Sequence, residues 1–75
     1  YTMKVYKSKE SKNTAYISEV MMHPYYGAPV QRGYQLAIYD SYGFNYHVSC
    51  HETQNDALWY LQNRCGGGYE YDKEI

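Results

Sequence analysis

The chain has 75 residues, a length that suits one small domain spanning residues 1–75 and excludes an assembly of several domains. Seven Lys and Arg against eight Asp and Glu give a net charge of −1, which argues against a protein built to neutralise many phosphates. Tyrosine is unusually common, with 12 residues beside one Trp and one Phe. Because so small a domain cannot bury that many rings, several must stand on the surface, where binding sites commonly use them.

The composition also bears on the compartment. No apolar run approaches the ~18 residues that suggest a membrane-spanning helix, and no charged and then apolar leader is visible. The two cysteines, Cys50 and Cys65, are too few for a disulfide scaffold. We therefore expect a cytoplasmic protein without membrane contact, in which both thiols stay reduced.

The N-terminal part of the chain predicts two strands joined by a polar turn. Residues 1–7 alternate between two faces, as in a half-buried strand, and one side carries Tyr1, Met3 and Val5. Residues 8–13 are polar and lysine-rich, and predict the turn. Residues 14–22 are rich in β-branched and aromatic side chains, so we expect a second strand. A helix is the alternative there, because helical spacing also puts three apolar residues on one face: Ile17, Val20 and Met21.

A loop and a hairpin follow. Residues 23–33 contain both prolines and two glycines, and predict a loop whose adjacent tyrosines, Tyr25 and Tyr26, suit a contact surface. Residues 34–39 and 44–50 predict a hairpin, with the four residues between them as its turn. We expect its inward face to carry Leu36, Ile38, Phe44, Tyr46 and Val48. We expect its opposite face to carry Gln35, Ala37, Tyr39, Asn45, His47 and Ser49.

The C-terminal part predicts one helix. Thr53 with Asp56 three residues later resembles a capping box, and the helix should run to about Arg64. Its apolar stripe is Ala57, Leu58, Leu61 and Cys65. The glycines at 66–68 should end it, and the remaining residues should form a short edge strand or a frayed end. The predicted fold is therefore α+β, with an antiparallel sheet of about four strands and a C-terminal helix packed on one face.

Catalytic and metal chemistry find little support in the sequence. The ligand types that zinc prefers gather at His47, Cys50, His51 and Cys65, but their spacing does not match a zinc motif, and His47 and Cys50 should point to opposite faces of a strand. We expect the two cysteines to be small buried residues at the junction of strand and helix. A Cys and His pair would also need a third group to orient it. We therefore predict a non-enzymatic protein with no cofactor and no metal.

Exposed rings predict a protein-binding surface instead, formed by Tyr6, Tyr25, Tyr26, Tyr39 and His47. The acidic C-terminal residues could mimic phosphates toward a basic channel: Glu70, Asp72 and Glu74. A nucleic-acid-binding domain is the alternative, in which the rings stack on bases and four lysines touch phosphates: Lys4, Lys7, Lys9 and Lys12. The scarcity of cations makes that alternative the weaker one. Free edge strands also allow a homodimer.

The stretch YQLAIYDSYGFNYHVSCHETQNDALWYL, residues 34–61, resembles the hairpin-plus-helix core of small phage-encoded anti-CRISPR proteins. The resemblance lies in architecture, size and tyrosine use, covers under half of the chain, and carries over no catalytic residue. It implies an anti-defence inhibitor that sterically blocks a host protein or nucleoprotein complex in the cytoplasm of an infected cell.

Overall fold

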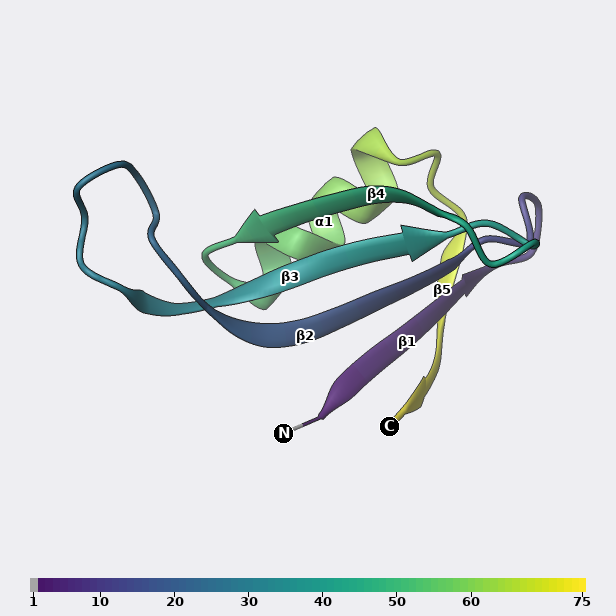
Figure 1. The fold of residues 1–75 in the computed structure, drawn as a ribbon. Coiled ribbons are helices and arrows are strands. Elements are labelled where there is room, and N and C mark those ends of the chain that lie inside the picture. The colour runs from purple at the N-terminus through teal and green to yellow at the C-terminus, as the bar shows by residue number, and fades with distance from the viewer. Residues whose placement is uncertain (1) are drawn as a thin grey trace.

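The computed structural model describes residues 2–75, in which five antiparallel strands and one helix form an α+β fold (Figure 1). The elements in chain order are β1 (Met3–Ser8), β2 (Thr14–Met22), β3 (Gln31–Tyr39), β4 (Asn45–His51), α1 (Gln54–Arg64) and β5 (Tyr69–Glu74). The strands lie in the order β4-β3-β2-β1-β5, and α1 covers one face of the sheet. The strand predicted for residues 14–22 is confirmed. Tyr1, expected on the side of Met3 and Val5, lies outside the described residues.

The sheet has five strands, so the prediction of about four was too low. The additional strand is β5, which pairs with β1 along its length and is closed by two backbone hydrogen bonds of 2.8 Å between Met3 and Ile75. For this segment the sequence is compatible with either an edge strand or a frayed end. The segment is a strand because pairing with β1 satisfies its backbone hydrogen-bonding groups, although it has little apolar surface of its own.

The hydrophobic core lies between the sheet and α1. Strand residues from β1, β2, β3 and β5 pack there against the helix: Tyr6, Ala15, Ile17, Leu36, Ile38 and Tyr69. From α1, Ala57 and Leu61 are fully buried, and Leu58 and Cys65 pack partly buried beside them. The apolar stripe predicted for the helix is thereby confirmed, and it positions α1 over β3 and β4.

Both ends of α1 follow the sequence prediction. The Thr53 hydroxyl accepts a hydrogen bond of 3.1 Å from the backbone N–H of Asp56, which satisfies one of the free donors of the first turn. After Arg64 the chain turns through three consecutive glycines with positive φ, at 95°, 68° and 74°. Side chains rarely adopt this conformation, so the run of glycines allows the sharp return from α1 into β5.

The register of β4 differs from the prediction. Leu36 pairs with Ser49 and Ile38 pairs with His47, so it is His47 and Ser49 that share the helix side of the sheet with these core residues. The turn and a bulge near Asn45 set this register, whereas the prediction followed the apolar pattern. As a result two residues assigned to the inward face are exposed: Phe44 and Val48. Tyr46, at the bulge, is 51 % exposed but lies on the helix side, with Tyr69 and Cys65 as neighbours. Cys50 is exposed as well, and only Cys65 is partly buried.

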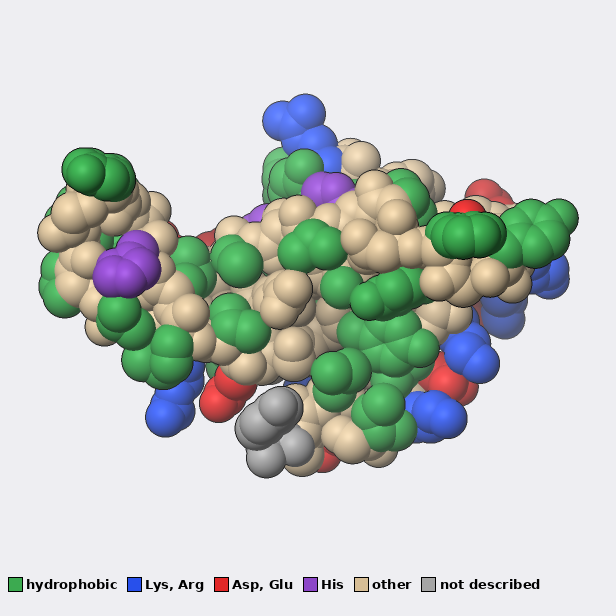
Figure 2. Space-filling model, in the orientation of Figure 1, with side chains coloured by type: hydrophobic (Ala, Val, Ile, Leu, Met, Phe, Trp, Pro, Cys, Tyr) green, Lys and Arg blue, Asp and Glu red, His purple; other side chains and the backbone are tan. Residues whose placement is uncertain are grey.

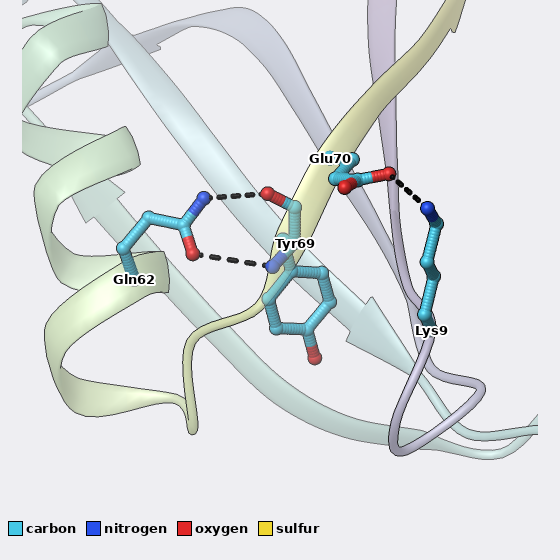
Figure 3. A network of polar contacts seen from close by, with 4 residues as sticks. All are labelled: Lys9, Gln62, Tyr69 and Glu70. Carbon is cyan, nitrogen blue, oxygen red and sulfur yellow. Dashed lines mark hydrogen bonds and ion pairs between the residues drawn. The ribbon is translucent and has the colours of Figure 1, made fainter.

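A glutamine side chain ties the end of α1 to the start of β5 (Figure 3). The Gln62 Nε2 group donates to the Tyr69 carbonyl at 2.7 Å, and the Tyr69 N–H donates to Gln62 Oε1 at 3.2 Å. On the neighbouring residue, the Glu70 carboxylate lies 3.2 Å from the Lys9 ammonium. The amide of Gln62 therefore acts as a short strand partner for Tyr69, at the point where β5 enters the sheet.

Replacing Gln62 by Ala should destabilise the domain by about 1–3 kcal/mol, because two hydrogen bonds to the backbone of a buried residue are lost. Chemical denaturation followed by circular dichroism measures this loss. Asn63→Ala is the matched control, since the Asn63 amide bonds within α1 to the Trp59 carbonyl. Equal stabilities of the two variants would show that the link to β5 contributes nothing.

Candidate functional site

The face of the sheet opposite α1 has no covering element among residues 2–75 and forms the most extensive candidate surface; we call it the open face. The register of the central strands sets its composition, since residues directly across from one another share a face. Its central rows are Met3, Val5 and Lys7 in β1, Thr14, Tyr16 and Ser18 in β2, Gln35, Ala37 and Tyr39 in β3, and Val48 and Cys50 in β4. Val5 is only 2 % exposed and adds little to the surface. Apolar and aromatic groups gather over these strands in Figure 2, and charged groups lie mainly around the margin.

A shallow hollow of about 560 Å³ lies on the open face. Tyr16 and Tyr39 stand in its wall, with ring centroids 5.6 Å apart and planes at 79°, an edge-to-face arrangement that holds both rings upright. The rest of its lining is small, polar or flexible: Met3, Thr14, Ser18, Gln35, Ala37, Asp40, Ser41 and Gly43. Such a hollow can receive an apolar side chain and offer hydroxyl and amide groups at its rim.

The hollow contains little free charge. Its one carboxylate, that of Asp40, accepts hydrogen bonds from the backbone N–H groups of Tyr42 at 2.9 Å and Phe44 at 3.0 Å. These bonds hold the β3–β4 turn and leave the carboxylate engaged with the protein itself. The hollow is therefore suited to a neutral ligand group more than to a phosphate or a cation.

The lysines and the acidic C-terminal residues pair with each other at the opposite edge of the sheet. Lys7 lies 3.8 Å from Asp72, Lys9 lies 3.2 Å from Glu70, and Lys4 is in register with Glu74. Basic β1 thus faces acidic β5. Two of the four lysines considered for phosphate contacts, and two of the three carboxylates considered for phosphate mimicry, are therefore engaged with each other.

A second exposed surface lies at the end of the long β2–β3 hairpin. Its last residue pairs extend beyond the partners that β1 and β4 provide, and together with the loop of residues 23–30 they form a projection that we call the arm (Figure 1). Tyr25 is 70 % exposed, and Tyr26 is fully exposed at the tip. The arm loop is nevertheless tied, because His23 Nδ1 lies 2.8 Å from the Ala28 carbonyl and the Ala28 N–H donates to the Tyr25 carbonyl at 3.0 Å.

The structure separates the predicted site residues into four places. Tyr25 and Tyr26 are on the arm, Tyr39 is on the open face, and the acidic residues lie in β5. Tyr6 is only 8 % exposed and packs beneath α1, so its assignment to a partner surface was wrong. His47 and Tyr39 were predicted to share a face. The structure places His47 on the helix side and Tyr39 on the open face, so that prediction was wrong. Tyr6 was misplaced because alternation divides a strand into two faces without showing which one the helix covers.

Sequence reasoning missed the part of the open face that β2 provides. Tyr16 belongs to the wall of the hollow, and Thr14 and Ser18 line it on the same side of the strand. The signal was the alternation in residues 14–22, which becomes informative only once that segment is known to be a strand. Tyr42 and Phe44, both exposed in the β3–β4 turn, extend the aromatic character of this end of the molecule.

A histidine cluster links β4 to α1 on the opposite side of the sheet. Ser49 Oγ lies 3.0 Å from His47 Nε2 and 2.7 Å from His51 Nε2. The Tyr60 ring of α1 packs against both imidazoles, at centroid distances of 5.3 Å and 5.1 Å. Because a hydroxyl has one proton, Ser49 donates to one imidazole and accepts an N–H from the other. The hydrogen bonds therefore join three side chains within β4, and the packing of the Tyr60 ring connects this edge strand to α1.

Burial lowers the pKa of His51, the nearby Asp56 carboxylate opposes this shift, and His47 adds to it. The arrangement favours neutral His51 in the folded protein.

Within residues 2–75 no group of three or more His, Cys, Asp or Glu side chains is placed to hold a metal ion. No helix in the same part of the chain is long and apolar enough to cross a membrane.

The stability of the domain should fall as the pH drops below about 6.5, the ordinary pKa of an unfolded histidine. Stability falls on acidification because the pKa of His51 is lowered in the folded protein, so the unfolded state takes up the proton at a higher pH than the folded state does. Denaturation curves between pH 7.5 and pH 5, a range of about two units around that value, would measure the fall. His51→Gln should make it shallower, and an unchanged slope in this variant would assign the pH dependence to other groups.

Comparisons of the chain with protein-family models, with curated protein sequences and with solved structures gave no match.

Proposed function

We propose that this chain is a non-enzymatic protein-binding domain that docks through its open face and its arm. The observation that carries the proposal is the hollow of about 560 Å³ beside Tyr16 and Tyr39. The lining of the hollow contains aromatic rings and hydroxyl groups, and its single carboxylate is already hydrogen-bonded within the protein. Interface cores are depleted in charge and enriched in Tyr, which matches this composition. The partner surface that fits is uncharged, with an apolar side chain that enters the hollow.

The arm supplies a second point of contact. Its loop is held by the contacts of His23 and Ala28, so Tyr25 and Tyr26 are presented without much ordering on binding. The arm and the β3–β4 turn lie at opposite ends of the view in Figure 1, and the molecule measures 39 Å along its longest axis. A partner that contacts both the hollow and the arm tip must therefore extend over a large part of this length.

The proposed mode of action is steric inhibition. The likeness of residues 34–61 to anti-CRISPR cores suggests the class of target, a host nucleoprotein complex, and places the action in the cytoplasm of an infected cell. A small rigid domain that occupies a working surface of such a complex needs no catalytic group of its own.

Affinity capture from a host-cell lysate, with and without nuclease, tests the proposal. We expect a stoichiometric protein complex that survives nuclease treatment and whose affinity changes little between 50 mM and 500 mM salt, a roughly tenfold range over which phosphate contacts weaken steeply. Capture that disappears with nuclease, or that is lost steeply with salt, would favour the nucleic-acid-binding alternative and contradict the proposal.

Substitutions on the two surfaces locate the contact. Ser18→Asp places a charge in the hollow, and the double change Tyr25→Ala, Tyr26→Ala removes the arm rings. Each should weaken binding of the captured partner by about tenfold or more while the thermal unfolding curve stays close to that of the parent.

Trp59→Ala is the matched control, because it removes a large ring that is 58 % exposed on α1, away from both surfaces. Titration calorimetry with the purified partner gives the affinities. A loss of binding in the Trp59 variant alone would move the interface to the helix side.

A further inference from the structure

The two edges of the sheet differ in their protection against pairing. The outer strand β5 carries four charged residues: Glu70, Asp72, Lys73 and Glu74. The outer strand at the other edge, β4, has the sequence NYHVSCH and contains no Lys, Arg, Asp or Glu. Charged side chains are a common means by which natural proteins keep an edge strand from pairing with another chain. The edge formed by β4 lacks that protection.

The β4 edge is also regular and stiff over most of its length. Its bulge lies at the Asn45 end, and from His47 to His51 the pairing with β3 is continuous. On the helix side Ser49 joins the two histidines of the cluster, and on the open face Val48 is 52 % exposed. A strand held in this way presents its outer backbone groups in an extended row with little conformational freedom left to lose.

We propose that β4 is a dimerisation edge, and that it pairs antiparallel with β4 of a second copy of this chain. A two-fold axis at Ser49, the centre of the regular segment, places Val48 of one copy opposite the partner's Cys50 and joins the two sheets into one. No charge meets a like charge across this contact, since β4 has none. Self-pairing closes at two copies, whereas pairing of β4 with the charged β5 edge of another copy would continue into a filament.

The position of α1 is compatible with this dimer. The helix packs over β3 and β4, and its Tyr60 ring lies against β4. With neighbouring strands ~4.8 Å apart, a helix axis midway between β3 and β4 lies about 10 Å from its two-fold mate. Packed helices lie 8–10 Å apart, so the two helices would meet side by side on one face of the joined sheet.

Sedimentation equilibrium of the chain under reducing conditions tests the dimer. We expect a species of twice the monomer mass that Val48→Lys weakens by at least tenfold in its dissociation constant, because two added cations would lie near the axis. Val30→Lys is the matched control, since Val30 is 49 % exposed and lies in the arm. A monomeric parent chain at millimolar concentration would overturn the proposal and leave β4 free for a strand of another protein. Equal weakening by both variants would also overturn it.

Cysteine cross-linking tests the pairing itself. In a Cys65→Ser background, Val48→Cys places a thiol opposite Cys50 of the partner subunit, and paired strands bring Cα atoms within the 4.4–6.8 Å that a disulfide requires. We expect mild oxidation to yield a covalent dimer on a non-reducing gel, and the further change Cys50→Ser to abolish it. Val30→Cys in a background without the natural cysteines should yield no covalent dimer. Val48 lies on the open face but outside the hollow, so failure of this test leaves the hollow and the arm as the proposed points of contact.

Discussion

The packing of α1 against one face of the sheet is the interaction on which the rest of this domain depends. Ala57 and Leu61 are fully buried against Leu36 and Ile38, and they decide which face of every strand becomes core. A helix of 11 residues cannot cover both faces of a five-stranded sheet. The opposite face therefore stays open within residues 2–75, and the proposed binding hollow lies on it.

The distribution of charge follows from the strand order. Because β5 returns beside β1, the C-terminal carboxylates meet the N-terminal lysines, and the exposed pairs neutralise each other locally while adding little stability. The hollow and the β4 edge are left nearly free of charge. This separation agrees with the two contacts that we propose: the hollow with the arm for a partner protein, and the β4 edge for a second copy. The histidine cluster connects the β4 edge to α1.

Several features of this protein follow from its sequence without a structure. The α+β class, the strand at residues 14–22, the β3–β4 turn, the cap at Thr53 and the stop at the glycines after Arg64 depend on local conformational preferences and hydrogen bonds. The apolar stripe of the helix depends on helical periodicity. All of these act over a few residues, which is why the sequence by itself determined them.

The tertiary structure decided the rest, because each remaining feature depends on residues far apart in the chain. Alternation showed that β1 and β4 have two faces, but only the docking of α1 buried Tyr6 and turned His47 toward Tyr60. The β4 register came from a turn and a bulge, and it reversed the face assigned to Val48. Likewise β5 became a strand through its pairing with β1, and Tyr16 reached Tyr39 only across two strands. Long-range pairing has no local signature, so these contacts could be seen only in the folded chain.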